Sequence, residues 1–433
     1  MVLADHEHSL SRQAWHMTSG NCFTENRVFC PLPWLHLAMT SRESEYRTCC
    51  ASERELLSNG RRLTFQNATP EEVLISPALE EIREKMRNGL RVDGCSLCDA
   101  EERAGLGSMR SIYLQHYHRE VSAIKEQPLR PLGIRNVELR LGNLCNLKCV
   151  MCSQENSSRF ENKTATSLPD PDVLKKLEVT LQTVDLVIFR GGEPLINPNH
   201  PLILQELIRG KRAQDVALVY NTNGTHLPED LRQLWQNFKS VTVWVSVDGI
   251  GEVNEFIRFP SSWKQVRANL ATLDLWAGEI LPLTWGITPT LQAYNALEIP
   301  RIAALLQEFS HPVRFPFLNL LHLPEALHVA NLPLHIRRMA AENLRIWLME
   351  NAESMFNHAT TITRKMNGLK ATARQTRENI KRAESVIAYL DAIEARADGL
   401  SKLQNLTRRI VEERQIGLPP FIERLGIMHA STP

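Results

Sequence analysis

The chain lacks the features that would direct it to a membrane or to a polyanion. Its 433 residues hold 50 Lys and Arg against 49 Asp and Glu, so a net charge of +1 gives no bulk field that selects nucleic acid. It has no apolar run long enough to span a bilayer. Residues 1–8 lack the regions of a signal peptide. We therefore expect a cytoplasmic protein of two or three domains, without membrane or nucleic-acid partners.

Cysteine is absent after position 152, and the nine cysteines group at metal-binding spacings rather than as a disulfide framework. The stretch Leu141–Cys152 reads LGNLCNLKCVMC, which places Cys145, Cys149 and Cys152 in a C-x3-C-x2-C pattern. A four-iron cubane usually takes four cysteines, so three leave one iron open to a small molecule. Tetrahedral zinc would need a fourth ligand from elsewhere in the chain.

A second motif, Phe189-Arg-Gly-Gly-Glu-Pro-Leu195, follows the apolar run Val184–Phe189. This run predicts a buried parallel strand. Glycines at the end of a strand let a ligand approach the backbone closely. Taken alone, the motif is also compatible with an ordinary turn between a strand and a loop.

Together the two motifs resemble radical S-adenosylmethionine (radical SAM) enzymes. Met151 stands where relatives usually have an aromatic residue, and its bulk suits that place. The resemblance implies a SAM-binding 4Fe-4S cluster and a backbone turn that holds the amino group of SAM. The residues implied are Cys145, Cys149 and Cys152 for the cluster and Gly191, Gly192, Glu193 and Pro194 for SAM.

Two further expected strands, 216–220 and 240–249, also end in polar residues. The same resemblance makes Asn221, Ser246 and Asp248 candidates for contacts to SAM. It also matches Arg258 to an arginine that pairs with the SAM carboxylate, a role that suits the bidentate guanidinium. The alternative for Arg258 is a surface ion pair.

Strand and helix patterns alternate between about 133 and 320, which predicts an α/β fold with a parallel sheet. Helices are expected over 263–276 and after Pro300. We expect a partial (β/α)6 barrel of the TIM type, with its chemistry at the C-terminal ends of the strands. The expected strands are 136–141, 184–189, 216–220, 240–249, 283–288 and 313–318.

The first 130 residues hold the other six cysteines. The stretch from Cys30-Pro-Leu-Pro-Trp34 to Cys49, with the C-x2-C pair near residue 95, resembles the auxiliary-cluster module called twitch or SPASM. In relatives this module usually follows the barrel, and a glycine is common where this chain has Ser44. The resemblance implies one auxiliary 4Fe-4S cluster on Cys30, Cys49, Cys95 and Cys98; a zinc site on the same residues is the alternative. Cys22 and Cys50 are left over, as buried thiols or, less favoured, as a hydrogen-atom donor or alternate ligand.

Helical periodicity dominates from residue 323 onward. The expected division is therefore an auxiliary-cluster domain over 1–130, a barrel over 131–322 and a helical region over 323–433. A basic stripe in the last region predicts a solvated helix face, with an acidic peptide or nucleic acid as the alternative ligand. The stripe consists of Lys370, Arg374, Arg377 and Lys381.

The predicted function is radical SAM chemistry. One electron, from a flavodoxin-type or ferredoxin-type donor, would cleave SAM to a 5′-deoxyadenosyl radical that removes hydrogen from an unactivated carbon. The expected substrate is a peptide or a small molecule such as a sugar or nucleoside, and no catalytic residue is identified. A cobalamin domain is not expected, because the N-terminal region carries cysteines instead of βα repeats. The alternatives are a binding module stabilised by structural zinc and an electron-transfer protein.

Overall fold

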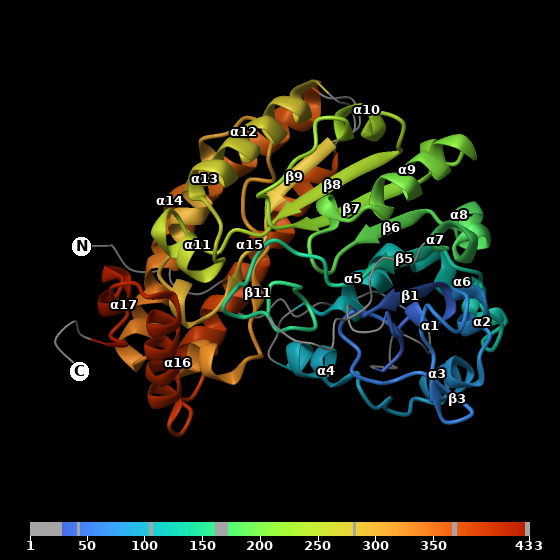
Figure 1. Ribbon diagram of the computed structural model, residues 1–433, viewed down its shortest axis with the longest axis horizontal. Helices are drawn as coiled ribbons and strands as arrows, with labels where there is room; N and C mark the ends of the chain where they lie inside the picture. Colours follow the sequence, from blue (N-terminus) through green and yellow to red (C-terminus); the bar gives the residue numbers. More distant parts are fainter. Residues whose placement is uncertain are drawn as a thin grey trace, which may run out of the picture.

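A seven-stranded sheet organises the computed structural model, which describes residues 28–40, 44–103, 107–160, 172–279, 283–365 and 370–428. The strand order is β2-β1-β5-β6-β7-β8-β9 (Figure 1). Neighbouring strands are parallel except for β1 and β2. The strands are β1 (His36–Met39), β2 (Tyr46–Arg47), β5 (Asn136–Leu139), β6 (Leu186–Phe189), β7 (Ala217–Thr222), β8 (Ser240–Val245) and β9 (Leu283–Ile287). The expected α/β fold with a parallel sheet is confirmed.

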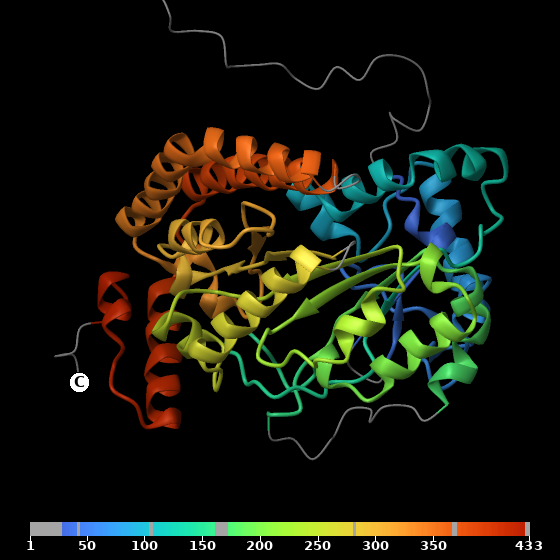
Figure 2. The ribbon, with the colours of Figure 1, turned by 90° about the horizontal axis from the view of Figure 1, so that it is seen from above.

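The two faces of the sheet differ in chemistry. Side chains alternate between faces along a strand, and β7 and β8 accordingly alternate between partly exposed and buried positions. The buried face is apolar and belongs to the main core. Helices follow this face of the sheet, as the green and yellow helices of Figure 2 show. They include α7 (Val173–Lys176), α8 (Glu178–Thr183), α9 (Asn199–Arg209), α10 (Leu231–Trp235), α12 (Trp263–Glu279) and α13 (Ile299–Gln307).

The expected helices over 263–276 and after Pro300 are present as α12 and α13. The predicted apolar positions of α12, Val266, Leu270 and Leu273, are all buried. Pro300 lies in the first turn of α13, where its missing N–H costs no hydrogen bond. These elements therefore formed where their local patterns predicted.

The expected sixth barrel strand over 313–318 is wrong. Residues of this segment still donate to β9, from Val313 N to Trp285 O at 2.8 Å and from Phe317 N to Ile287 O at 2.9 Å. Proline at 312 and 316 removes the donors that a regular ladder needs. Only the short β11 (Asn319–Leu320) forms beyond it, and it pairs with β10 (Thr290–Leu291).

The sixth parallel strand comes from the N-terminal region instead. His36 and Ala38 of β1 pair with Asn136 and Glu138 of β5, so β1 is a strand of the main sheet. The main sheet therefore takes strands from both sides of residue 130. The rest of the region comprises the hairpin β3 (Leu57–Ser58) and β4 (Arg61–Arg62) with helices α1 (Leu32–Leu35), α2 (Pro70–Leu74), α3 (Pro77–Arg87), α4 (Ser96–Arg103), α5 (Met109–His116) and α6 (His118–Glu126).

The C-terminal region is helical, as expected. Its helices are α14 (Leu334–Lys365), α15 (Lys370–Ala392), α16 (Gly399–Arg414) and α17 (Pro420–Arg424), and α14 and α15 pack side by side (Figure 1). Of the basic stripe, Arg374 is exposed and pairs with Glu378 at 2.7 Å, whereas the side chain of Lys370 lies outside the described residues. None of the helices that the structure describes has the length and hydropathy to cross a membrane.

Helix α15 bridges the two ends of the sheet. Its Arg382 donates to the carbonyl of Leu318, in the segment beside β9, and to the carbonyl of Gly107 at 2.7 Å, between α4 and α5. The same guanidinium lies 5.0 Å from the ring centroid of Phe317. One side chain therefore joins the edge beyond β9 to the N-terminal region, which adjoins β1.

Replacing Leu37 with Ala tests whether β1 belongs to the main core. Leu37 is fully buried in β1, so we expect Leu37→Ala to lower the free energy of unfolding by about 2–5 kcal/mol in a single transition. Leu275→Ala is the control, because that side chain on α12 is 61% exposed. Urea unfolding followed by circular dichroism measures both. A loss confined to a separate early transition would contradict the shared core.

Candidate functional site

The cysteine loop follows β5 and is pinned to the segment after α11 (Glu252–Ile257). Lys148 N donates to Phe259 O at 2.5 Å and Val150 N to Ile257 O at 2.8 Å. Cys149, between these two contacts, is 7% exposed, whereas Cys145 and Cys152 are partly exposed. The loop therefore presents its three thiols from a fixed backbone.

The three thiols also interact electrostatically. The pKa of Cys149 is raised to about 12, mainly by burial and also by the neighbouring Cys152 and Cys145, while Arg258 opposes the shift. Burial likewise raises the pKa of Cys152, again opposed first by Arg258. Three soft sulfur donors with a cation beside them suit a thiolate-bound iron cluster, whose negative charge the guanidinium would offset.

The Gly-Gly-Glu-Pro turn packs directly on the cysteine loop. Gly191 and Gly192 have φ values of 80° and 53°, in the left-handed region that favours glycine. A Cβ on Gly192 would lie 2.2 Å from the carbonyl oxygen of Leu144, so only glycine permits this approach. Glu193 N then donates to the same oxygen at 2.7 Å. Pro194 begins a short 3-10 helix, Pro194–Ile196.

Glu193 joins the turn to the end of β7. Its carboxylate accepts from Thr222 Oγ1 at 2.7 Å and Asn223 N at 2.6 Å, and from Leu195 N at 3.1 Å. Burial raises the pKa of Glu193 to about 7 despite these three donors. The side chain is thus engaged within the protein, and the backbone of the turn is the part left to meet a ligand.

Asp248 and Arg258 form a buried ion pair beside the cysteine loop. Asp248 Oδ2 lies 2.7 Å from Arg258 Nε, although the N–H direction does not meet hydrogen-bond geometry. Oδ1 of Asp248 accepts from Thr290 N at 2.7 Å. Burial raises the pKa of Asp248 even though Arg258 counteracts it. The sequence predicted a role for each residue separately and missed their pairing.

Arg258 keeps donor capacity that Asp248 does not use. Burial alone would lower its pKa, but Asp248 and then Cys149 outweigh burial, so the pKa is raised. Among the described residues, the guanidinium of Arg258 makes one ion pair, through Nε to Asp248, and no hydrogen bond. Arg258 therefore belongs to a buried ion pair with Asp248, and the alternative of a surface ion pair is wrong.

Asn221 and Ser246 lie at adjacent strand ends, as predicted. Asn221 belongs to β7, and Ser246 N donates to Thr222 O at 2.8 Å just after β8. Oδ1 of Asn221 is buried and, within the described ranges, has no hydrogen-bond partner. A buried acceptor without a donor costs free energy unless a ligand or water supplies one.

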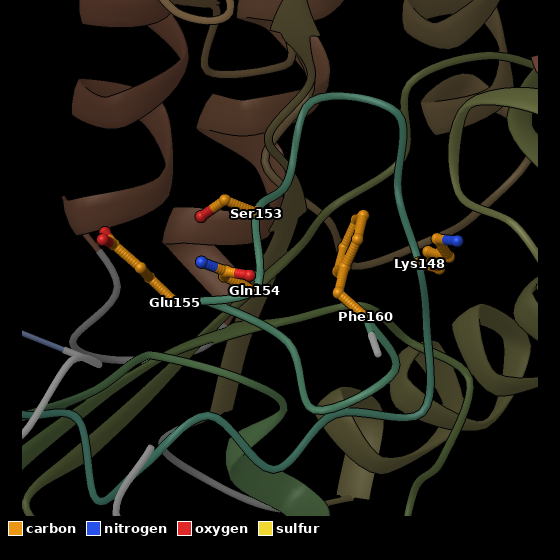
Figure 3. Close-up of a pocket in the computed structure, with 5 residues that line it drawn as sticks. All are labelled: Lys148, Ser153, Gln154, Glu155 and Phe160. Atoms are coloured by element: carbon orange, nitrogen blue, oxygen red, sulfur yellow. The ribbon is translucent and has the colours of Figure 1, made fainter. Parts of the chain in front are cut away.

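A cavity of about 480 Å³ opens directly beside the cysteine loop. Lys148 and Phe160 face each other across the loop, with the Lys148 Nζ 5.3 Å from the ring centroid, and the polar side chains follow Cys152 (Figure 3). This cavity gives solvent and ligands access to the loop. Its lining consists of Lys148, Ser153, Gln154, Glu155 and Phe160.

The four N-terminal cysteines named from the sequence line one small pocket. Cys30 precedes α1, Cys49 follows β2, and the pair Cys95 and Cys98 lies at the start of α4. Burial raises the pKa of Cys30 to about 12 and of Cys95 to about 11, and the thiols raise one another's pKa further. Residues 68 positions apart in the chain, from 30 to 98, thus meet at one point.

Two backbone positions explain how this pocket forms. A Cβ on Gly94 would lie 2.4 Å from Arg54 N, so glycine is required directly before Cys95. Ser44, where relatives commonly have glycine, takes a left-handed φ of 49°.

Of the two remaining cysteines, Cys22 lies outside the described residues. Cys50 is partly exposed and interacts with Glu138 and Arg190. These two side chains and Arg140 were not singled out from the sequence. The alternation Asn136, Glu138, Arg140 along β5 is the signal that would have marked a polar inner face.

Across the described part of the chain, no group of three or more His, Cys, Asp or Glu side chains is arranged to hold a single metal ion. Mononuclear zinc needs four ligands around one point. In a cubane each thiolate binds a different iron, so the sulfurs are spread around a larger group.

Residues 139–274 match the family model described as the Radical SAM superfamily. The chain is 27% identical over 277 residues to Fe-coproporphyrin III synthase of Methanosarcina barkeri, covering 63% of this chain and 65% of that protein. It is 25% identical over 199 residues to GTP 3′,8-cyclase of Clostridium acetobutylicum, covering 45% and 60%. Both matches span less than two thirds of the relative's length.

Similar solved structures include AdoMet-bound anSMEcpe, at a TM-score of 0.39 and 16% identity over 51% of this chain and 61% of that one. Another is Streptococcus suis SuiB bound to precursor peptide SuiA, at a TM-score of 0.31 and 16% identity over 52% and 49%.

Breaking the Asp248–Arg258 pair should destabilise the protein strongly. Asp248→Asn keeps an acceptor for Thr290 N but leaves a buried guanidinium uncompensated, so we expect a loss of about 3–5 kcal/mol in the free energy of unfolding. Urea unfolding of the cluster-free protein measures it. The double variant Asp248→Asn with Arg258→Met should lose clearly less. Equal losses in the single and double variants would show that the charges are not coupled.

Proposed function

Since residues 139–274 match the Radical SAM superfamily model, we propose that this protein is an enzyme that cleaves SAM reductively and uses the resulting radical on a substrate. The observation that carries the proposal is the packing of the Gly-Gly-Glu-Pro turn on the cysteine loop, through the contact of Gly192 with Leu144. It brings the two motifs of this chemistry to one edge of the sheet.

In this proposal Cys145, Cys149 and Cys152 hold a 4Fe-4S cluster with one open iron. When bound, that cluster supplies the electron that cleaves the sulfonium bond of SAM and so generates a 5′-deoxyadenosyl radical. Arg258 balances the charge of the thiolates, as its effect on the pKa of Cys149 and Cys152 indicates.

The polar strand ends bind and orient SAM. The backbone of Gly191 to Pro194 meets its amino group, and the buried Oδ1 of Asn221 offers an unused acceptor. Ser246 contributes a hydroxyl at the neighbouring strand end. Asp248 positions Arg258, whose free Nη atoms suit a carboxylate in a bidentate way.

We further propose that Cys30, Cys49, Cys95 and Cys98 hold an auxiliary 4Fe-4S cluster. Support comes from the convergence of the four cysteines on one pocket. Structural zinc in the same pocket is the second candidate, because the C-x2-C spacing also suits zinc. Clusters of this kind call for the reducing conditions of a cytoplasm.

The substrate is proposed as a peptide or a small molecule. The named relatives refer to a porphyrin and to GTP, and SuiB is bound to a precursor peptide, so all three classes occur among similar proteins. The electron is proposed to come from a flavodoxin-type or ferredoxin-type donor. A purely structural role for the cysteines gives no reason for the glycine turn on the cluster loop.

Anaerobic purification should yield brown protein with two four-iron clusters, or about eight iron atoms per chain. Changing Cys145, Cys149 and Cys152 together to Ala should remove about half of the iron, and so should Cys95→Ala with Cys98→Ala. Cys50→Ala is the matched control and should keep all of it. Metal analysis that finds one zinc with one cluster would favour the zinc candidate, and iron unchanged in the triple variant would exclude the assignment.

Reduced protein given SAM should release 5′-deoxyadenosine and methionine even without substrate. Cys149→Ala should release none, because the proposed cluster loses one of its three thiolate ligands. Chromatography of the products, with Cys50→Ala as the active control, measures the difference. Equal amounts of 5′-deoxyadenosine from the parent and the Cys149→Ala protein would contradict the proposed function.

A further inference from the structure

The inner face of the sheet gathers charged side chains that the SAM site does not use. Along β5, Val137 and Leu139 belong to the apolar core, so Asn136, Glu138 and the following Arg140 occupy the opposite face. Arg190 directly follows β6, and its N–H donates to Leu139 O at 3.0 Å. Glu138, Arg140 and Arg190 thus meet at the C-terminal edge, one residue before the glycine turn.

Two guanidinium groups share one carboxylate in this cluster. Oε1 of Glu138 accepts from Arg140 Nε at 3.0 Å and lies 2.9 Å from its Nη2, whereas Oε2 lies 3.6 Å from Arg190 Nη1. Arg140 is therefore held closely and Arg190 loosely. The Nε of Arg190 is buried and, among the described residues, has no hydrogen-bond partner.

The groups around these charges are neutral. Burial lowers the pKa of His36 on β1 to about 4. Tyr113 of α5, stacked on His36, has its pKa raised by burial. Within the described ranges, no second carboxylate pairs with either arginine. The cluster thus carries an excess of one positive charge.

An uncompensated charge in such surroundings costs free energy unless a counter-charge arrives. The side chains of Arg140 and Arg190 are 22% and 27% exposed, so a ligand can reach them, whereas Glu138 is covered at 2%. Guanidinium groups pair with planar oxyanions through two parallel N–H bonds. The missing component is therefore an anion, not a further cation or an apolar group.

We propose that Arg140 and Arg190, held by Glu138, bind an oxyanion of the substrate, a carboxylate or a phosphate. The inference rests on the proposed function and narrows its substrate to an anionic molecule. The place fits, because Phe189 pairs with Tyr220 and so sets Arg190 beside Asn221, at the SAM edge of the sheet. The partly exposed Trp244, paired with Asn221, continues the same row across the inner face.

Cys50 provides a reporter for this site. Its thiol interacts with Glu138 and Arg190 and is partly exposed. Iodoacetate carries a carboxylate and iodoacetamide does not, so the ratio of their alkylation rates at Cys50 reports anion binding independently of the thiolate fraction. Peptide mass spectrometry of the cluster-loaded protein measures the ratio at Cys50 alone.

We expect iodoacetate to be favoured over iodoacetamide at Cys50, and Arg190→Gln to lower this preference by about tenfold, as loss of a charge-assisted pair implies. Arg190→Lys keeps the positive charge but loses the planar guanidinium. Its preference for iodoacetate should lie between those of the parent and the Arg190→Gln protein. Phosphate and acetate should compete with iodoacetate, while chloride at equal ionic strength should not. Arg209→Gln on α9 is the control, since that side chain is 77% exposed and pairs with Glu206.

Equal alkylation ratios in the parent, Arg190→Gln and Arg190→Lys proteins would overturn the oxyanion site. If SAM alone abolished the preference for iodoacetate, Arg140 and Arg190 would bind the carboxylate of SAM. The assignment of these arginines to the substrate would then be wrong. Iron content and 5′-deoxyadenosine are measured on the same preparations. If the parent protein shows no preference for iodoacetate but cleaves SAM normally, only this inference is contradicted. If the parent protein shows the preference but does not cleave SAM, only the proposed function is contradicted.

Discussion

The contact between Gly192 and Leu144 is the constraint on which the rest of the site depends. The loop that carries Cys145 and the turn after β6 come from different strands, and only a residue without a Cβ allows them to touch. Glu193 then extends the connection, since its N–H meets Leu144 and its carboxylate holds the end of β7. Three successive strand ends are fixed by one close approach, so the cysteine loop cannot move independently of the strands that would bind SAM.

A sheet with one apolar and one polar face explains why the chemistry gathers where it does. The apolar face is covered by helices and stabilises the fold, which leaves polar groups such as Glu138, Asn221 and Ser246 to the opposite face. Burial makes each of these groups costly unless it is paired. Some are paired within the protein, as Asp248 is with Arg258, whereas Asn221 Oδ1 and Arg190 Nε have no hydrogen-bond partner among the residues that the structure describes.

Local chemistry was predictable from the sequence, and long-range pairing was not. The cysteine spacings and the apolar periodicity of α12 rest on neighbours a few residues apart, and both are found where expected. The strand β1 has four residues that are all buried and a parallel partner 100 positions away, so no alternation marked it. The segment 313–318 looked like a strand because its apolar residues alternate, but two prolines deny it a regular ladder. The pairing of Asp248 with Arg258 depends on how a strand end and a helix end meet in space.

Helix α15 connects the segment beside β9 with the N-terminal region that contains the pocket of four cysteines. The regular sheet ends at β2 and β9, and the segment after α13 covers the β9 edge through hydrogen bonds from Val313 N and Phe317 N. Arg382 links the segment beside β9 to Gly107, close to the α4 helix that begins at the pair Cys95 and Cys98. The N-terminal region is also tied in through β1, so the pocket of four cysteines is held to the sheet from both sides. The sheet is therefore joined to the N-terminal region through β1 and to the C-terminal helices through Arg382, so all three parts of the chain fix the position of one another.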